Sequence, residues 1–469
     1  MIHYHIPQLM KKLLATAYLT LAICTLASAS SALFVKNHQM LLGKNFDWND
    51  GEGVILLNKR DVNKVAYGLD KKNVVAWKSR YSSITFNQVG KEFPYGGVNE
   101  RGLAIEMLWY DDSHYEESGQ PTVSELEWIQ FNLDNYKTAA EVQFYLDSMN
   151  INPLHANLHY IVADRGGRSF VVDFVNGKTV VSITEEEFQA LTNSNYLESL
   201  EYYKSTKNNI DFDSRQSLDR FCQLSSKADT KQGKTVQEVF DILSESSEDG
   251  NNYKTYWTVV YDLPNSLVYY KSYDSKKVKK INLNDAFSIS APGTFAIDVN
   301  NEQVYWQKYT PEWNLKLLSA ALEKAQVKLN IPQANQHMME PGSFEMDEAY
   351  SKNHKDLKIN FNIKKQKGVL FYSLMEGEEN YEKFRGSVSA MVEANSNTIQ
   401  KIHYSFPIGN VALAAFHDLN KNATLDKFLG IPSEPTAFSN GAKGLFGPPK
   451  FEKVKFNVLS VSEMTIQIK

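Results

Sequence analysis

Apolar residues follow three different patterns along the chain. A continuous apolar run over residues 13–26 follows Lys11 and Lys12 and ends at Ala27 and Ala29, the pattern of a secretory leader with a small-x-small cleavage site. Cleavage after Ala29 would make Ser30 the first residue of the mature protein. We therefore expect residues 1–29 to be a signal peptide and the protein to be periplasmic or secreted.

From residue 30 to about residue 299, strand-like and helix-like segments are interleaved. Segments with apolar residues at helical spacing are 126–136, 139–149, 198–205, 217–228 and 236–244. Segments typical of strands and hairpins are 32–36, 39–43, 102–110, 159–183 and 256–273. Strands that form sheets with helices packed outside predict an α+β layered architecture for residues 30–310.

The pattern changes after residue 310. Residues 311–329 have helical spacing, and residues 331–356, with their prolines and mixed charges, are typical of a linker. Short alternating segments follow at 357–363, 369–375, 399–406, 411–417, 453–458 and 464–468. Such segments predict a small all-β sandwich domain over residues 357–469, joined to the first domain by a helix and linker over 311–356.

Composition and charge narrow the classes of protein. The 469 residues are 42% hydrophobic and 22% charged, with a net charge of −5, as in an ordinary globular protein. A mildly acidic chain without a basic stripe argues against a nucleic-acid partner. Beyond the leader, no apolar run reaches the length of a membrane span, and Cys222 is the only thiol, so an internal disulfide is excluded.

A serine at the start of a chain has distinctive chemistry. Its hydroxyl is a weak nucleophile until a base removes the proton, and a free α-amine titrates near pH ~8, well below lysine. An N-terminal Ser30 would therefore carry its own base. Before cleavage the same nitrogen is an amide and accepts no proton, so removal of the leader would also activate the protein.

The residues after Ser30 resemble a known family. Two strand-like segments, 32–36 and 39–43, lead into a Gly-Lys-Asn-Phe-Asp-Trp run that ends at Trp48. This stretch is similar to the start of the choloylglycine hydrolase and penicillin V acylase family, where a Cys-Thr start leads through a hairpin into Gly-Arg-Asn-x-Asp.

The chain departs from that family at two positions. Ser30 stands where the family has cysteine, and Lys44 stands where it has arginine; lysine keeps the charge but loses the planar fork of arginine. Cys24-Thr25 also imitates the family start. It is the alternative nucleophile, although it lies inside the apolar leader.

Three later segments resemble the same family in the same order. Asn99 lies in Gly-Val-Asn-Glu-Arg-Gly-Leu, Asn193 in Leu-Thr-Asn-Ser-Asn, and Arg220 in Ser-Leu-Asp-Arg-Phe. The family has Gly-x-Asn-Glu-x-Gly-Leu, Leu-Thr-Asn-x-Pro and Ser-x-x-Arg-Phe. Each residue alone could equally be a turn asparagine, a helix-capping asparagine or a solvated arginine. Their order relative to Ser30 and Asp47 favours the family.

The resemblance implies a four-layer αββα sandwich of N-terminal nucleophile hydrolases and a site made of Ser30, Lys44, Asp47, Asn99, Asn193 and Arg220. Ser30 would attack an amide carbonyl while Asp47 orients its amine. The backbone N–H of Asn99 and the side chain of Asn193 would stabilise the oxyanion. Arg220 and Lys44 would supply positive charge that stabilises the anionic intermediate. No metal or other cofactor is required.

The last domain resembles a family of small bacterial secreted β-domains without an assigned function. The resemblance rests on Ala-Phe-His-Asp-Leu-Asn-Lys-Asn from Ala415 and on Phe-Ser-Asn-Gly-Ala-Lys-Gly-Leu-Phe-Gly-Pro-Pro from Phe438. Oxygen-bearing side chains alternate at Asp418, Asn420, Asn422 and Asp426, as in a calcium loop, but the later glutamate spacing of an EF-hand is missing. A solvated turn is the alternative.

These observations predict a secreted amidohydrolase that cleaves a linear carbon–nitrogen amide bond of a small N-acyl substrate. Penicillin V, conjugated bile salts and N-acyl homoserine lactones are substrates of the kind that relatives take. Two alternatives stay open: a binding or surface protein that has lost the chemistry, and an acyltransferase that passes the acyl group to an acceptor other than water. The family also makes a homo-oligomer compatible with the sequence.

Overall fold

The structure is a computed structural model of the chain, and it describes residues 30–36, 39–67, 75–115, 122–146, 149–154, 156–183, 188–228, 234–250, 253–325, 331–339, 354–384, 386, 388–422, 424–428, 431–444 and 447–469. The predicted signal peptide over 1–29 and the alternative nucleophile Cys24 lie outside these residues. Within the described part of the chain, no helix is both long enough and apolar enough to cross a membrane.

The predicted first hairpin forms the middle of a six-stranded sheet with the order β14-β1-β2-β15-β16-β17. Its strands are β1 (Ser31–Lys36), β2 (Met40–Trp48), β14 (Phe188–Leu191), β15 (Lys254–Asp262), β16 (Leu267–Ser272) and β17 (Lys279–Asn282). Ser31 pairs with Asn45 across the β1–β2 hairpin. Every residue of β1 except its last is buried, because both faces of this sheet are covered.

A second, nine-stranded sheet has the order β13-β12-β11-β8-β7-β6-β3-β18-β19. Its strands are β3 (Val54–Asn58), β6 (Ser83–Asn87), β7 (Pro94–Asn99), β8 (Leu103–Trp109), β11 (Leu158–Asp164), β12 (Ser169–Val175), β13 (Lys178–Ile183), β18 (Phe295–Asp298) and β19 (Gln307–Lys308). Phe86 of this sheet contacts Tyr261 and Tyr270 of the first sheet with ring centroids 6.3 and 5.9 Å apart. The two sheets therefore pack face to face.

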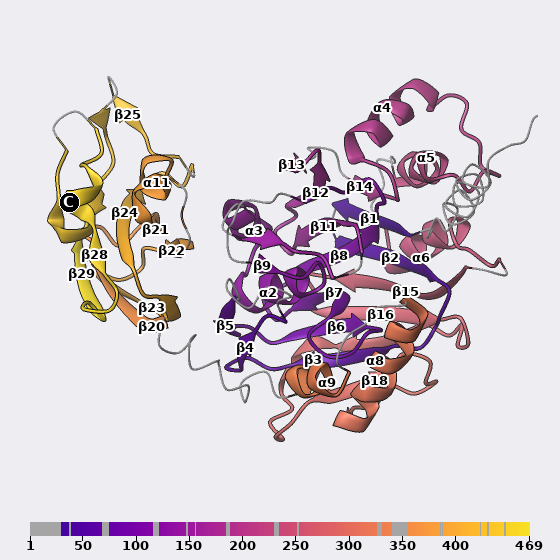
Figure 1. Cartoon of the computed structure of the whole chain (residues 1–469). Helices are drawn as coiled ribbons and strands as arrows, with labels where there is room; N and C mark the ends of the chain where they lie inside the picture. Colours follow the sequence, from indigo (N-terminus) through magenta and orange to yellow (C-terminus); the bar gives the residue numbers. More distant parts are fainter. Residues whose placement is uncertain are drawn as a thin grey trace, which may run out of the picture.

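Helices cover the outer face of each sheet (Figure 1). The helices α2 (Glu127–Asn135) and α3 (Ala139–Tyr145) pack on the nine-stranded sheet, and α5 (Ser217–Ala228) and α6 (Val236–Glu245) pack on the six-stranded sheet beside α4 (Tyr196–Thr206). Side chains of Thr138, Asn195 and Thr235 cap α3, α4 and α6 at their N-termini. The predicted αββα layers are confirmed.

The first domain also contains small elements at its edges. They are two short strand pairs, β4 (Asn63–Val65) with β5 (Ala76–Lys78) and β9 (Thr122–Val123) with β10 (Asn150–Ile151), and the helix α7 (Leu283–Phe287).

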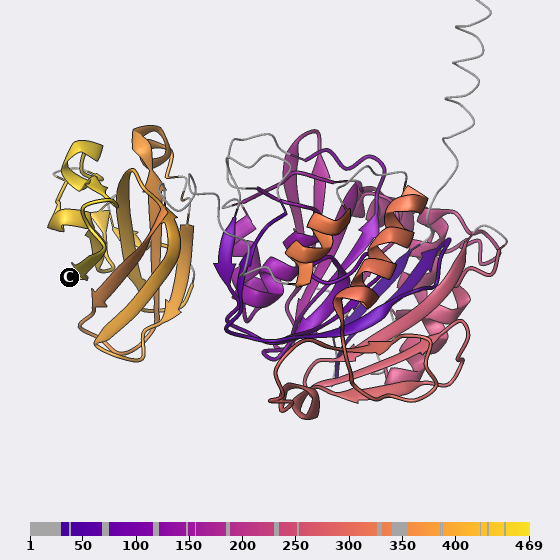
Figure 2. The ribbon, with the colours of Figure 1, turned by 60° about the horizontal axis from the view of Figure 1, so that its bottom comes forward.

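The expected linker contains a helix. Helix α8 (Pro311–Ala325) was predicted, but α9 (Ile331–Met339) occupies a segment that the sequence assigned to the linker. Figure 2 shows the two helices side by side. Ala334 and Met338 are buried in the core of the first domain. Proline is compatible with the first turn of a helix, so Pro332 did not signal a linker, and this part of the prediction is wrong.

The C-terminal domain is a β-sandwich, as predicted. Its three-stranded sheet is β23-β20-β29, and its larger sheet has the order β22-β21-β24-β27, with β28 paired to β24. The strands are β20 (His354–Asn362), β21 (Val369–Glu376), β22 (Val388–Glu393), β23 (Thr398–Pro407), β24 (Asn410–Asp418), β27 (Thr436–Phe438), β28 (Phe456–Asn457) and β29 (Glu463–Gln467). Shorter elements are α11 (Gly377–Glu382), β25 (Lys427–Phe428), β26 (Ile431–Pro432), η2 (Ser439–Gly441) and α12 (Phe451–Val454). Aliphatic and aromatic side chains from both sheets form one separate core.

Candidate active site

Arg220 joins the predicted site residues into one hydrogen-bonded group. It projects from α5, and its side chain is 2% exposed. Its Nη1 donates to the carbonyl oxygen of Ser30 at 2.7 Å and to Oγ of Ser31 at 2.8 Å, while Nη2 donates to Oδ1 of Asn193 at 2.7 Å. The structure thus brings Ser30, Asn193 and Arg220 together at the start of β1.

Arg220 is a buried cation that needs nearby negative charge. Burial lowers the pKa of its guanidinium, and the carboxylates of Asp47 and Glu248 oppose this effect. A guanidinium stays protonated in proteins, so the group keeps its positive charge beside Ser30. This agrees with the charge role predicted for Arg220.

Asp47 is the buried acid of the same site. It lies on β2, two residues beyond Asn45, which pairs with Ser31, and it is 1% exposed. Its Oδ1 accepts a hydrogen bond from Oγ1 of Thr255, whereas its Oδ2 is buried and has no hydrogen-bond partner among the described residues.

The environment of Asp47 changes its acidity. Burial raises the pKa of this carboxyl to about 7, and the hydrogen bond from Thr255 and the charge of Arg220 act in the opposite direction. Buried polar atoms without partners are uncommon in native proteins. The open Oδ2 therefore has the chemistry to accept a hydrogen bond from a group such as a free α-amine.

Asn193 is held from two sides. It follows β14 and precedes α4, and its Nδ2 donates to the carbonyl oxygen of Trp109 at 2.8 Å, while its Oδ1 accepts from Arg220. These contacts fix which end of the amide is the donor. An amide nitrogen carries a second hydrogen, which could donate to an oxygen atom of a substrate.

Lys44 lies apart from this group. It is 2% exposed, and its Nζ forms an ion pair at 3.1 Å with Oε2 of Glu106, which is also 2% exposed. The Tyr261 hydroxyl donates to Oε1 of Glu106 at 2.6 Å, and Lys44 donates to the Tyr95 carbonyl oxygen at 3.4 Å. Lys44 is thus paired with Glu106, and its charge also opposes the rise in the pKa of Asp47, so its charge role in the site stays a prediction.

The residue opposite Glu106 in the sheet is a glycine. A Cβ atom built on Gly96 would lie 2.1 Å from the Glu106 carboxylate, and Gly96 is the residue paired with Glu106 across β7 and β8. Glycine at this position therefore makes space for the buried carboxylate.

Asn99 does not join the site. Its Oδ1 accepts hydrogen bonds from the N–H groups of Arg101 and Leu103 at 2.9 and 3.1 Å, and its Nδ2 donates to the Leu133 and Tyr136 carbonyl oxygens at the end of α2. Strand β8 separates it from Asn193, which contacts Trp109 at the other end of that strand.

Seven residues of β8, from Leu103 to Trp109, span roughly 20 Å at ~3.4 Å per residue. The oxyanion role predicted for Asn99 therefore does not fit the geometry, because its motif forms the β7–β8 turn. Ser31 and Thr255 are site residues that the sequence analysis missed. Trp48, Trp109 and Tyr110 were expected near the site only as aromatic residues that would suit an apolar acyl chain.

Aromatic side chains border the site. The ring of Trp48, which follows Asp47, lies 5.5 Å from the ring of Trp109 and 6.5 Å from that of Tyr253, measured between centroids. All three residues are half-buried, so they present apolar surface to solvent beside the polar group. Tyr110, also expected near the site, is instead buried against His159 with the rings 5.1 Å apart.

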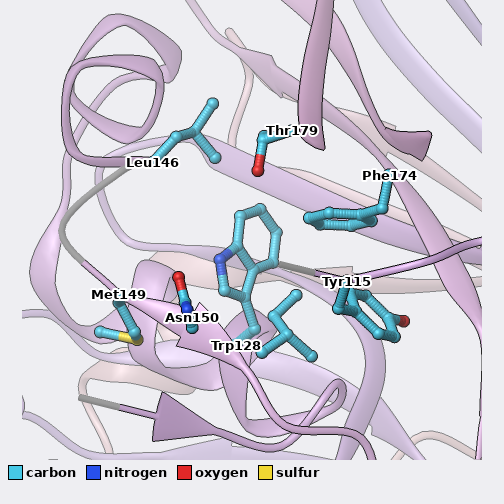
Figure 3. A pocket seen from close by; sticks show the side chains of 8 residues that line it. Tyr115, Trp128, Leu146, Met149, Asn150, Phe174 and Thr179 are labelled. Atoms are coloured by element: carbon cyan, nitrogen blue, oxygen red, sulfur yellow. The ribbon is translucent and has the colours of Figure 1, made fainter. Parts of the chain in front are cut away.

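A small pocket lies on the opposite side of the nine-stranded sheet, under α2 and α3. It is lined by Tyr115, Trp128, Leu146, Met149, Asn150, Ile151, Phe174 and Thr179 (Figure 3). Its free space is about that of one water molecule. This pocket is too small for an organic substrate and is separated from Ser30 by the sheet.

The proposed calcium loop bonds to itself. The amides of Asn420 and Asn422 donate to the Asp426 carboxylate at 2.7 and 3.0 Å, and Asp418 accepts from the Lys421 N–H at 2.6 Å. Within the ranges that the structure describes, no group of three His, Cys, Asp or Glu side chains could hold a metal ion. These hydrogen bonds suit a solvated turn, and calcium binding at this loop stays a prediction.

The chain is similar to proteins of known families. The profile of the family described as linear amide C–N hydrolases, choloylglycine hydrolase family, matches residues 30–223, and that of an uncharacterized protein conserved in bacteria matches residues 359–467. Penicillin V acylase of Pectobacterium atrosepticum is 30% identical over 135 residues, which are 25% of this chain and 36% of the acylase.

Two further proteins resemble a longer part of the chain. Bile salt hydrolase/transferase of Lactiplantibacillus plantarum is 22% identical over 307 residues, covering 54% of this chain and 92% of that protein. The structure of penicillin V acylase from Agrobacterium tumefaciens superposes with a TM-score of 0.53 at 22% identity, covering 60% of this chain and 98% of the acylase. Residues 30–223 are therefore similar to the choloylglycine hydrolase family of linear amide C–N hydrolases, and the first domain shares the fold of penicillin V acylase.

Proposed function

We propose that the first domain hydrolyses a linear amide bond of a small N-acyl substrate, with Ser30 as an N-terminal nucleophile released by cleavage after Ala29. The observation that carries this proposal is the buried Asp47 carboxylate, which has one open oxygen beside the Arg220 group that holds Ser30. A free α-amine on Ser30 would supply the donor that this oxygen lacks.

The proposed reaction is an acyl transfer in two steps. Ser30 Oγ attacks the amide carbonyl, its proton passes to the α-amine, and the same proton then goes to the leaving amine as the C–N bond breaks. A water molecule next attacks the acyl-serine ester and gives its proton to the amine. The carboxylic acid leaves, and Ser30 regains its hydroxyl hydrogen.

Charge develops on the carbonyl oxygen in both steps. The second N–H of the Asn193 amide is the donor proposed for this oxyanion, since Arg220 and Trp109 fix the orientation of the amide. Arg220 adds positive charge within the same hydrogen-bonded group. A preformed donor of this kind contributes about 2.7–4 kcal/mol of transition-state stabilisation in other hydrolases.

The proposed substrate carries an apolar or aromatic acyl group. Trp48, Trp109 and Tyr253 offer half-buried apolar surface next to Asp47 and Asn193, and aromatic rings favour contact with such groups. Penicillin V and bile salts, the compounds in the names of the relatives, and N-acyl homoserine lactones are the first candidates. The same chemistry requires a processed chain, so we propose that the protein acts after export to the periplasm or the medium.

Mass spectrometry and kinetics test the proposal together. The N-terminus of the protein purified from its native host is sequenced, and the processed protein and its Ser30→Ala variant are assayed against penicillin V, glycine-conjugated bile salts and N-acyl homoserine lactones. We expect a chain that begins at Ser30 and turnover that the variant lacks. A chain that begins at Cys24 or keeps its leader, or turnover that survives in the variant, would contradict the serine mechanism.

Two alternatives are tested by the same protein. A binding protein is motivated by the departures from the family at Ser30 and Lys44, and it is favoured if no amide is turned over and Ser30→Cys creates activity. An acyltransferase is compatible with a relative named as hydrolase/transferase. It would form new amides when a second amine, such as taurine, is added, and product analysis separates this outcome from hydrolysis.

A further inference from the structure

The loop that carries Asn193 is held by buried groups that have no place in the reaction proposed above. It covers Thr192 to Asn195, between β14 and α4. The Thr192 hydroxyl donates to the Ser217 carbonyl oxygen at 2.9 Å, which fixes the loop to the start of α5. Two main-chain groups at the ends of this loop face the nine-stranded sheet. They are the carbonyl of Thr192 and the N–H of Tyr196, the first residue of α4.

His159 of β11 holds the first of these groups. Its side chain is completely buried, and its Nε2 lies 2.7 Å from the Thr192 carbonyl oxygen. Its Nδ1 lies 2.8 Å from Oδ1 of Asp173. A carbonyl oxygen only accepts hydrogen bonds, so Nε2 donates to Thr192, and Nδ1 and the Asp173 carboxyl share the second hydrogen bond of the ring.

Asp173 of β12 holds the second group. It is completely buried, and its Oδ2 accepts a hydrogen bond from the N–H of Tyr196, the first residue of α4, at 3.1 Å. One carboxylate therefore joins the histidine to the helix that follows Asn193. The histidine fixes the residue before Asn193, and the aspartate fixes the residue three positions after it.

We propose that the His159–Asp173 pair positions the Asn193 amide for oxyanion stabilisation. Burying a pair of ionisable side chains is expensive, and such pairs are often no more stabilising than apolar residues. The pair is therefore better explained by the geometry that it imposes than by stability. This inference rests on the proposed function, in which Asn193 is the oxyanion donor.

A residue that only orients a catalytic side chain can still have a large effect on the reaction rate. Removal of residues that orient a reacting group typically costs about 10- to 100-fold in activity, and a misplacement near 1 Å can cost about 10²-fold. Since Arg220 and Trp109 bind the side chain of Asn193 directly, loss of the backbone anchor should tilt the amide without releasing it. Rate, and not binding, is the quantity expected to change.

The test uses the full processed chain and three variants. His159→Gln removes the ring that bridges the Thr192 carbonyl and Asp173, and Asp173→Asn removes the acid at nearly constant shape. Ser113→Ala is the matched control, because Ser113 is buried and donates to the carbonyl oxygen of Leu158, the residue before His159, at 2.7 Å, without any described contact to the Asn193 loop.

Two readouts are recorded for each variant. The first is kcat and KM on penicillin V or whichever amide the parent protein hydrolyses. The second is the side-chain amide signal of Asn193 in protein labelled with ¹⁵N-asparagine, identified by its loss in Asn193→Asp. We expect His159→Gln and Asp173→Asn to lower kcat about 10- to 100-fold with KM changed less than about threefold, and to move the Asn193 signal. Ser113→Ala should lower thermal stability and leave both readouts unchanged.

The two readouts separate the inference from the function on which it rests. If the parent protein hydrolyses no amide, the proposed function fails, and the Asn193 signal alone decides whether the pair positions the loop. If both pair variants keep the kcat and the Asn193 signal of Ser113→Ala, the pair is only structural and the inference is wrong. If one of the two pair variants, His159→Gln or Asp173→Asn, does not fold, the other variant still tests the inference, because each of them alone breaks the pair.

Discussion

Strand β2 carries two buried charged residues, Lys44 and Asp47, that differ in how completely they are paired. Lys44 has a carboxylate partner at 3.1 Å, and that carboxylate accepts a further hydrogen bond from Tyr261. Asp47 has one bonded oxygen and one buried oxygen without a described partner. Only the second arrangement leaves a place for an incoming group.

This difference in pairing predicts different roles for the two residues, one in stability and one in activity. A buried charge that is fully paired adds little net stability, but its loss leaves an uncompensated partner. A buried carboxyl that is only half paired has a raised pKa and binds a proton or a donor readily. We therefore expect changes at Lys44 to act mainly on stability and changes at Asp47 to act mainly on activity.

The largest expected effect is the loss of activity in Asp47→Asn. An amide at this position cannot accept from the Ser30 amine as strongly as a carboxylate, so kcat/KM should fall about 10²- to 10³-fold. The free energy of unfolding, measured in urea, should change little, because asparagine keeps an acceptor for Thr255 and Glu248 still opposes the charge of Arg220. Activity within threefold of the parent, or a clear loss of stability, would place Asp47 with Lys44 instead.

Breaking the Lys44–Glu106 pair should lower the stability of the protein. Lys44→Met leaves Glu106 buried without its cation, and the free energy of unfolding should fall by about 3–5 kcal/mol. Urea denaturation of Lys44→Met, Glu106→Gln and the double variant checks this. The double variant should recover at least half of the loss; losses that simply add would show that the two side chains are not coupled.

A more gradual effect should appear with pH in the chain that keeps its leader. Its Asp47 carboxyl has a pKa raised to about 7 by burial, so the native state holds a proton that the unfolded state loses near pH 4. Stability relative to Asp47→Asn should be highest below about pH 4 and fall as pH rises to about 7. In the processed chain the amine stabilises the carboxylate, and this fall should be smaller; equal curves for both chains would contradict an amine at Oδ2.

The smallest effect is expected for Lys44→Arg, which restores the residue usual in the family. The larger guanidinium has to fit between Glu106 and the Tyr95 carbonyl in a closed space, which should cost about 1–3 kcal/mol of stability. Activity should stay within about threefold of the parent, because Lys44 is not part of the Arg220 group. A large gain in activity would return Lys44 to the site.

The sequence predicted the parts of the site that are local in the chain. Asp47 lies on the second strand of the first hairpin, close in the chain to Ser30, so its place near Ser31 could be expected from the hairpin alone. Arg220 and Asn193 could be assigned only by resemblance. Their contacts with Ser30 depend on how α5 and the Thr192–Asn195 loop pack, which periodicity does not encode.

Asn99 and Lys44 show where pattern reasoning fails. The Asn-Glu-x-Gly-Leu motif is equally typical of a turn, and the structure uses it as the β7–β8 turn. Glu106 lies 62 positions after Lys44, and nothing in either segment specifies which lysine a buried glutamate will meet across two sheets. Helix α9 was predicted as a linker because most of its residues are polar, and the few apolar residues that reach the core do not give a clear helical pattern.

Gly96 should vary together with Lys44 and Glu106 among related sequences. A Cβ atom at residue 96 would lie 2.1 Å from the Glu106 carboxylate, so a side chain there would displace this carboxylate from its position beside Lys44. In a collection of related sequences, glycine at 96 should accompany glutamate at 106 and lysine at 44 as one inherited block. Lineages that keep a larger residue at 96 should have a small residue at 106 and no buried lysine to neutralise.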